Sequence, residues 1–280
     1  MVTILNTLQN LHQHTTFCDG ADTPEEIINE AISRGFGAIG FSGHSYMHYS
    51  EGHSMSIDGT EQYKKTIAEL KAKYLGKIDV FCGLEFDMFS EIDLSGYDYI
   101  IGSVHYLKIG DEYVGFDRDA KAVKDVIDTY FGGNGLEYAK EYYRHLATLS
   151  NYGRFDILGH FDLITKHKEK ADFFDCGSKE YRFAAIEAAE ALAGKIKLFE
   201  INTGAISRGY RTTPYPDPFI IKEMKRLGYG AIISSDCHNK NFIDCNFREA
   251  EELLLSCGYK EKYILTGNGF ITVGLKDNAI

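Results

Sequence analysis

Two histidines near the start of the chain, His12 and His14, are followed five residues later by Asp19. Residues 4–11 are rich in Leu, Ile and Thr, which favours a β-strand that ends at this pair. On a strand, residues i and i+2 point to the same face, so both imidazoles are expected to face one point. The chain turns at Gly20, so the Asp19 carboxylate can reach that point too. Imidazole and carboxylate groups bind metals, so the spacing favours a metal site if other segments supply further ligands.

Histidine and carboxylate residues also follow most of the other predicted strands. These strands end near His44, Glu85, His105, His160, Asp236 and His238. In a parallel barrel the carboxyl ends of all strands lie on one face, where active sites form. The other four histidines are expected in loops or on a helix face: His48, His53, His145 and His167. The strand-end residues therefore predict a metal centre whose imidazole and carboxylate ligands suit zinc, iron or manganese.

Short apolar runs alternate with amphipathic segments, which indicates βα units and a parallel sheet. Strands are expected over residues 4–11, 38–41, 80–84, 99–104, 156–158, 196–201 and 231–234. Helices are expected over about 24–34, 60–75, 120–131, 135–151, 178–193, 217–227 and 247–257, before a last apolar run at 263–265. Thr23 and Glu26 form a capping box at the first helix. The pattern predicts an α/β fold, a closed TIM-like (β/α)7 barrel in a single domain over residues 1–280, with an open doubly wound sheet as the alternative.

The composition disfavours several classes of protein. The formal net charge is −11, and the basic cluster Lys166–Lys170 is expected to be a solvated loop, so no nucleic-acid partner is predicted. No apolar run is long enough to cross a membrane. Six cysteines without a Cys-x-x-Cys pair, and an N-terminus without the layout of a signal peptide, favour reduced thiols and a cytoplasmic location. The sequence indicates no oligomeric state.

The strand-end residues belong to seven short motifs. They are His12-x-His14, Asp19-Gly20, Gly43-His44, Gly-Leu-Glu85, Ser-Val-His105, Gly-His160-Phe-Asp162 and Asp236-x-His238. These motifs resemble those of the PHP (polymerase and histidinol phosphatase) family. The resemblance extends over residues 12–238. Together with Glu200-Ile-Asn-Thr-Gly, the motifs look most like those of the stand-alone histidinol-phosphate phosphatases. The chain departs from the family pattern at Gly43, where a carboxylate often stands, and at Gln13, where Thr is usual.

This resemblance implies a distorted seven-stranded barrel and a centre of three divalent metal ions, which could be zinc, manganese or iron. One ion would take His12, His14, Glu85 and Asp236. A second would take Asp19, His44 and His238. A third would take His105, His160 and Glu85, so that Glu85 bridges two ions.

The implied reaction is the hydrolysis of L-histidinol phosphate to L-histidinol and phosphate, a step of histidine biosynthesis. Three divalent ions would outweigh three carboxylates and one hydroxide, which leaves positive charge for a phosphate dianion. A hydroxide that bridges two ions would attack phosphorus in line. Catalytic roles are expected for Asp236, Glu85 and Arg208, and Asp236 or a metal-bound water would handle the proton of the leaving alkoxide.

Arginine binds phosphate well because its guanidinium offers two parallel donors. Three arginines are candidates for the small-molecule phosphate monoester: Arg154, Arg208 and Arg211. Arg208 follows the sixth predicted strand and is the best placed. Arg154 precedes the fifth predicted strand by two residues, so it could instead be a surface residue at the other end of the barrel. Asp162 is expected to orient His160, to bind substrate or to cap a helix.

Other functions are kept as alternatives. Within the family these are phosphatases of nucleotides or sugar phosphates and a proofreading exonuclease, which the acidic composition disfavours. Outside it they are C–N bond hydrolysis and a non-catalytic metal-binding module. The aromatic and acidic segment 106–117 is expected either to stack on an imidazole and pair with an ammonium group or to be an ordinary surface loop.

Overall fold

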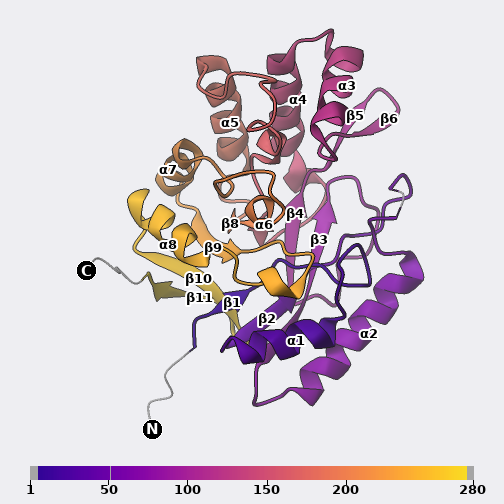
Figure 1. Ribbon diagram of the computed structural model, residues 1–280, viewed down its shortest axis with the longest axis vertical. Coiled ribbons are helices and arrows are strands. Elements are labelled where there is room, and N and C mark those ends of the chain that lie inside the picture. The colour runs from indigo at the N-terminus through magenta and orange to yellow at the C-terminus, as the bar shows by residue number, and fades with distance from the viewer. Residues whose placement is uncertain (1–5, 51, 276–280) are drawn as a thin grey trace.

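The computed structural model describes residues 6–50 and 52–275, and its centre is a seven-stranded parallel sheet (Figure 1). The strand order is β1-β2-β3-β4-β7-β8-β9, and each neighbouring pair is parallel. The strands are β1 Gln9–Asn10, β2 Ala38–Phe41, β3 Asp79–Asp87, β4 Tyr99–Ser103, β7 Ile157–Leu158, β8 Leu198–Asn202 and β9 Gly230–Ser234. A parallel bridge between Gln13 and Cys237 joins the first and last strands just beyond their ends. The sheet therefore curls into a nearly closed barrel, which confirms the predicted fold class.

Helices in the connections cover the outside of this barrel. They are α1 Pro24–Ser33, α2 Ile57–Lys73, α3 Ala120–Phe131, α4 Gly135–Ala147, α5 Lys179–Leu192, α6 Gly204–Ser207, α7 Pro218–Arg226 and α8 Phe247–Ser256. Short 3-10 turns lie at Leu149–Asn151, Leu163–Thr165 and Lys240–Phe242. In Figure 1, α3, α4 and α5 stand together on one side of the sheet, and α1 and α2 lie on the other. No helix in the described part of the chain is long and apolar enough to cross a membrane.

Capping residues fix where the first two helices begin. Thr23 and Glu26 form the predicted capping box, and the Thr23 hydroxyl accepts from the Glu26 amide at 3.3 Å. The helix α2 begins at Ile57, three residues earlier than predicted, because the Ser56 hydroxyl accepts from the Gly59 amide at 2.9 Å. A serine at this position stabilises a helix by satisfying one of its free amides.

Two β-hairpins differ from the predicted elements. The segment predicted as a loop after His105 contains β5 Tyr106–Ile109 and β6 Glu112–Gly115. The predicted run 263–265 is part of β10 Glu261–Thr266, which pairs with β11 Gly269–Gly274. Each hairpin turns through two residues that include a glycine, and such turns match the twist of paired strands. The first predicted strand is shorter than expected, and its residues 4–5 lie outside the described part of the chain.

Apolar side chains fill the inside of the barrel below the carboxyl ends of its strands. This inner core consists of Leu11, Ala38, Phe81, Tyr99, Ile101, Ile157, Leu198, Ile232 and Leu265. The Tyr99 hydroxyl donates to the carbonyl oxygens of Leu11 and Phe41. A Cβ atom at Gly83 would lie 2.2 Å from the Tyr99 ring, so the ring needs glycine there. The filled interior leaves the carboxyl-end rim as the place for polar chemistry.

Candidate metal centre

The nine residues predicted as metal ligands meet at the carboxyl-end rim of the barrel. His12 and His14 follow β1, His44 follows β2, and Glu85 lies near the end of β3. The remaining residues follow β1, β4, β7 and β9: Asp19, His105, His160, Asp236 and His238. Their ligand atoms form three overlapping groups, each able to hold a cation.

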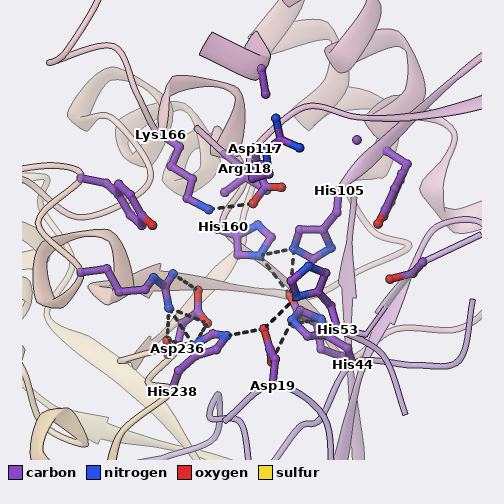
Figure 2. Close-up of a pocket in the computed structure, with 18 of the residues that line it drawn as sticks. Asp19, His44, His53, His105, Asp117, Arg118, His160, Lys166, Asp236 and His238 are labelled. Carbon is purple, nitrogen blue, oxygen red and sulfur yellow. Dashed lines mark hydrogen bonds and ion pairs between the residues drawn. The ribbon is translucent and has the colours of Figure 1, made fainter. Parts of the chain in front are cut away.

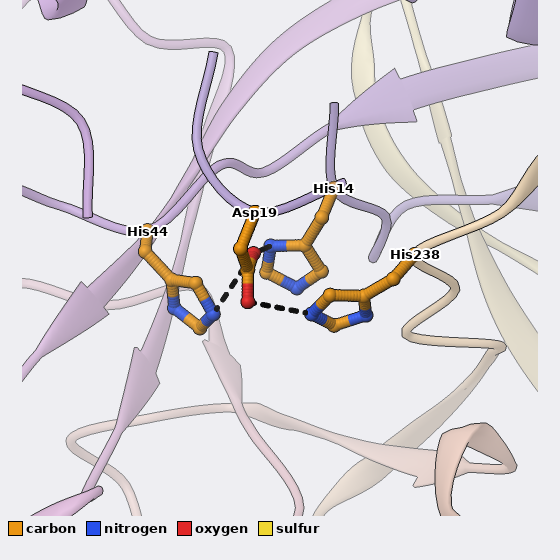
Figure 3. Close-up of side chains that lie close together, drawn as sticks. All are labelled: His14, Asp19, His44 and His238. Atoms are coloured by element: carbon orange, nitrogen blue, oxygen red, sulfur yellow. Dashed lines mark ion pairs between the residues drawn. The ribbon is translucent and has the colours of Figure 1, made fainter. Parts of the chain in front are cut away.

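The first group contains His14, Asp19, His44 and His238, whose ligand atoms all lie within 4.8 Å of one another (Figure 3). The Asp19 carboxylate is its centre. Its Oδ1 lies 3.7 Å from His14 Nδ1 and 3.8 Å from His44 Nε2, and its Oδ2 lies 3.3 Å from His238 Nε2. The predicted second ion would take three of these residues, and the structure adds His14.

The second group contains His12, His14 and Asp236, all buried. Asp236 Oδ1 lies 3.7 Å from His12 Nε2 and 3.2 Å from His14 Nε2. Glu85 Oε2 approaches the same two nitrogens at 3.3 and 3.5 Å. These four residues are the set predicted for the first ion.

The third group contains His44, Glu85 and His105, whereas the third predicted ion has His160 in place of His44. His160 lies next to this group: Glu85 Oε1 is 3.0 Å from His160 Nε2 and 3.6 Å from His105 Nε2. Glu85 Oε2 lies 2.9 Å from His44 Nδ1 and faces the second group. The two oxygens of Glu85 thus point to different sets of imidazoles, which is the arrangement that a bridging carboxylate needs.

Several ligand atoms in this centre are buried without a hydrogen-bond partner among the described residues: His12 Nε2, His14 Nε2, Asp19 Oδ1 and Glu85 Oε2. An unsatisfied buried polar atom costs about 1–3 kcal/mol. Four such atoms facing one region are the donor set that a divalent cation satisfies. The residues therefore fit the divalent ions that the sequence predicts.

The carboxylates change the proton affinity of the imidazoles around them. Burial lowers the pKa of His44, but the Glu85 carboxylate outweighs this effect and raises that pKa to about 9. The same balance of burial and Glu85 raises the pKa of His105 to about 9. Burial, together with His238 and His44, lowers the pKa of His14 to about 3. Without a cation, His44 and His105 therefore carry protons beside the Glu85 carboxylate.

Metal affinity should therefore increase with pH up to about 9. Below this pH, His44 and His105 carry protons that a coordinating cation must displace. His14 is already neutral and releases none. Competition with a chromophoric chelator should show that the protein binds metal more tightly at each step from about pH 6.5, the ordinary pKa of an imidazole, to about pH 9. Above about pH 9 the affinity should change little, because His44 and His105 are by then deprotonated. Calorimetry in two buffers should show proton release, and an affinity independent of pH over this range would contradict the assignment.

Two carboxylates that the sequence analysis did not assign hold the ligand histidines in orientation. Glu200 Oε2 lies 2.9 Å from His12 Nδ1, and Asp87 Oδ2 lies 3.0 Å from His105 Nδ1. Each contact turns the other ring nitrogen, Nε2, toward the centre and fixes the tautomer. The sequence positions of both carboxylates could have indicated this role. Asp87 follows Glu85 at the strand spacing i+2, and Glu200 lies in β8, the strand for which no ligand was predicted.

A cavity of about 550 Å³ opens over the centre (Figure 2). Arg208 lines this cavity and is the predicted arginine that the structure places there. Its Nη1 donates to the backbone oxygen of Asp236 at 2.6 Å, and its Nη2 donates to Asp236 Oδ2 at 3.1 Å. His238 Nδ1 lies 2.9 Å from Arg208 Nη1. Arg208 thus both faces the cavity and orients two metal-ligand candidates.

The other residues predicted to bind substrate do not line this cavity. Arg154 is exposed and precedes β7, so it lines a separate cavity at the amino ends of the strands. Arg211 is 4% exposed and lies 4.0 Å from Asp162 Oδ2, and Asp162 is fully buried. Arg211 also donates to the Thr165 hydroxyl. The structure therefore corrects the three predictions. Arg154 lies at the opposite end of the barrel from the site. Arg211 and Asp162 form a buried pair that joins two loops.

Two cavity residues, His53 and Lys166, were not predicted as part of the site, and Asp117 was predicted only as part of the segment 106–117 that could pair with an ammonium group. His53 Nδ1 lies 3.7 Å from Asp19 Oδ2, although the His53 side chain is 67% exposed. Lys166, expected in a solvated loop, pairs with Asp117 at 2.8 Å, and both line the cavity. His53 and Lys166 have neither a strand-end position nor a ligand spacing that would have distinguished them in the sequence.

Comparison with known proteins agrees with this geometry. A family model described as "PHP domain" matches residues 10–204. A protein of Deinococcus radiodurans named "Probable histidinol-phosphatase" is 27% identical, over 88% of this chain and 92% of its own length. A Schizosaccharomyces pombe protein with the same name is 26% identical, over 88% of this chain and 86% of its own.

Two solved structures share the fold. The structure of a histidinol phosphate phosphatase from Lactococcus lactis subsp. lactis, complexed with zinc, L-histidinol and phosphate, has a TM-score of 0.72. It is 24% identical and covers 95% of this chain and 99% of its own. A putative histidinol phosphatase from Listeria monocytogenes has a TM-score of 0.75 at 19% identity, over 86% of this chain and 99% of its own. Both support the seven-stranded barrel.

Proposed function

The chain belongs to the PHP domain family, and on that premise we propose that it hydrolyses L-histidinol phosphate to L-histidinol and phosphate. The observation that carries the proposal is the rim of overlapping His, Asp and Glu groups below a cavity that Arg208 lines. The names of the two curated relatives support the choice of substrate. The reaction would make the protein a phosphomonoesterase of histidine biosynthesis.

We propose three cation sites, occupied by zinc, manganese or iron. The first would use His12, His14, Glu85 and Asp236, the second would use Asp19, His44 and His238, and the third would use Glu85, His105 and His160. Bound divalent ions would supply Lewis acidity, which would offset the charge of the phosphate oxygens and lower the pKa of a water so that it can give up a proton and attack phosphorus. The groups overlap at His14 and His44, and Glu85 Oε2 lies 3.5 Å from His14 Nε2, which supports ions that share ligands.

The protein's own side chains would bind the phosphate and move the proton. Arg208 would donate to phosphate oxygens from a guanidinium that Asp236 already orients. Burial opposes ionisation of Asp236, but Arg208 and His12 hold its pKa well below the ordinary value. Asp236 is therefore ionised, and we assign it the proton of the attacking water. As the phosphorus–oxygen ester bond breaks, Asp236 would return that proton to the leaving alkoxide.

The remaining expectations form part of the same proposal. We propose that residues 1–280 make one catalytic domain, and that it acts on small phosphate monoesters and not on nucleic acid. The volume of the cavity, about 550 Å³, suits a ligand of that size. We also propose a cytoplasmic location, which suits the six free cysteines.

A substrate panel tests the function. Protein stripped with a chelator and reloaded with zinc, manganese or iron should release phosphate from L-histidinol phosphate. We expect a kcat/KM at least tenfold higher than on nucleoside monophosphates or sugar phosphates, a difference of about 1.4 kcal/mol. Chelated protein should be inactive on every substrate. A stronger activity on nucleotides or sugar phosphates would contradict the assigned substrate but would still agree with a metal-dependent phosphomonoesterase.

A further inference from the structure

One carboxylate in the cavity wall belongs to none of the cation-binding groups. Asp19, Glu85 and Asp236 line the cavity and are each part of a group. Asp117 lines the cavity as well but contributes to none of the groups found among the described residues. Figure 2 shows Asp117 on the opposite side of the cavity from Asp19 and His238. Its negative charge is therefore available for something other than a metal.

The chain fixes Asp117 in this wall from two directions. The preceding residue, Phe116, is 1% exposed and packs edge-on against Tyr138 and Tyr142 of α4. The backbone carbonyl of Asp117 lies 2.8 Å from His167 Nε2, which can donate a hydrogen bond to it. A side chain whose backbone is held on both sides has the rigidity that specific recognition requires.

The Asp117 carboxylate has room for a second cation. Its Oδ2 accepts from Lys166 Nζ at 2.8 Å, and no hydrogen bond from the described residues reaches its Oδ1. The neighbouring Arg118 is 77% exposed and pairs with Asp119 at 3.0 Å. Burial opposes ionisation, but Lys166, His105 and His160 together hold the pKa of Asp117 below its ordinary value. The group is ionised, and its side chain is still 28% exposed.

We propose that Asp117 binds the ammonium group of an amino-alcohol leaving group and so selects phosphate monoesters that carry this cation beside the ester. The inference rests on the proposed function. In L-histidinol phosphate the ammonium group stands on the carbon next to the ester methylene, so it must lie close to the reacting phosphate. Asp117 lines the same cavity as His105 and His160, so it faces the place where the substrate would lie. An ammonium group in a partly enclosed cavity is attracted more strongly than one in open solvent.

Two substrates that differ only in the ammonium group test this role. L-histidinol phosphate is compared with its deamino analogue, 3-(imidazol-4-yl)propyl phosphate, on the metal-loaded protein. Asp117→Asn should lower kcat/KM on L-histidinol phosphate about 10- to 100-fold, the usual range for losing a charged hydrogen bond. The analogue should change by less than about threefold by the same reasoning. The Asp117→Asn change would also release Lys166 from its ion pair, and this would happen with either substrate. The readout is therefore the ratio of kcat/KM for the two substrates.

Two further variants separate recognition from folding. Asp117→Glu keeps the charge and should restore part of the preference for the ammonium substrate. Asp111→Asn removes an exposed acid from the turn of the β5–β6 hairpin and should leave both rates unchanged. Metal content and melting temperature are measured for each variant.

An equal loss on both substrates, or no loss on either, would overturn the role of Asp117 and leave the proposed function standing. A wild-type protein that hydrolyses other monoesters but not L-histidinol phosphate would overturn both proposals.

Discussion

Replacement of Glu85 by glutamine should nearly abolish hydrolysis. Glu85 is 1% exposed and its two oxygens face imidazoles on opposite sides. Glutamine has the same shape but neither the charge nor the second acceptor oxygen, so the cations of both groups lose a ligand. Removing one partner of a buried charged set costs about 3–5 kcal/mol, which corresponds to a fall in kcat/KM of roughly a hundred- to several-thousandfold.

Metal content should fall with activity in this variant. Plasma mass spectrometry on dialysed protein should find fewer ions per chain than in the wild type, and circular dichroism should find the same secondary structure. Glu91→Gln provides the matched control, because Glu91 is an exposed acid just beyond the same strand. An E85Q protein with full activity and full metal content would remove the bridging role from Glu85.

The convergence of the nine ligand candidates could be predicted because it depends only on topology. A parallel barrel brings all carboxyl ends of its strands to one rim, whatever the lengths of the strands. The strands β1 and β7 contain only two residues each, yet His12 and His160 still arrive at the rim. The position of a residue relative to its strand was therefore enough to predict that its side chain lies at the rim.

The grouping of these ligands could not be read from the sequence in full. The sequence analysis gave His14 to one ion, whereas the structure places it in two groups. Its Nε2 lies 3.2 Å from Asp236 and its Nδ1 lies 3.7 Å from Asp19. Which ring nitrogen faces which neighbour depends on rotamers and on the path of the loop to Asp19, and neither follows from residue spacing.

The arginines show the same limit. Arg154 precedes its strand, and this order alone places it at the end of the barrel opposite the site. Arg208 and Arg211 both follow β8, and the sequence favours Arg208 without fixing where either side chain points. The one-turn helix α6 ends at Ser207, after which Arg208 turns to the cavity and Arg211 to the Asp162 side chain. Such a difference over three residues is set by packing.

The backbone at Asp236 has a left-handed conformation, with a φ of 44°. Asparagine and aspartate adopt this conformation more readily than other non-glycine residues. Asp236→Asn should therefore fold normally, so that any loss of activity reports on the carboxylate charge and not on the backbone.

Asp236→Asn should lower kcat/KM by about three orders of magnitude, the effect of roughly 4 kcal/mol. The carboxylate is 5% exposed, faces His12 and His14, and accepts from Arg208 Nη2 at 3.1 Å. An amide would leave the guanidinium without its buried counter-charge and could not take the proton of the attacking water. Steady-state kinetics with metal analysis checks the expectation. Asp244→Asn is the control, since it removes only a partly exposed pair with Arg34, and a D236N enzyme within tenfold of this control would exclude Asp236 from catalysis.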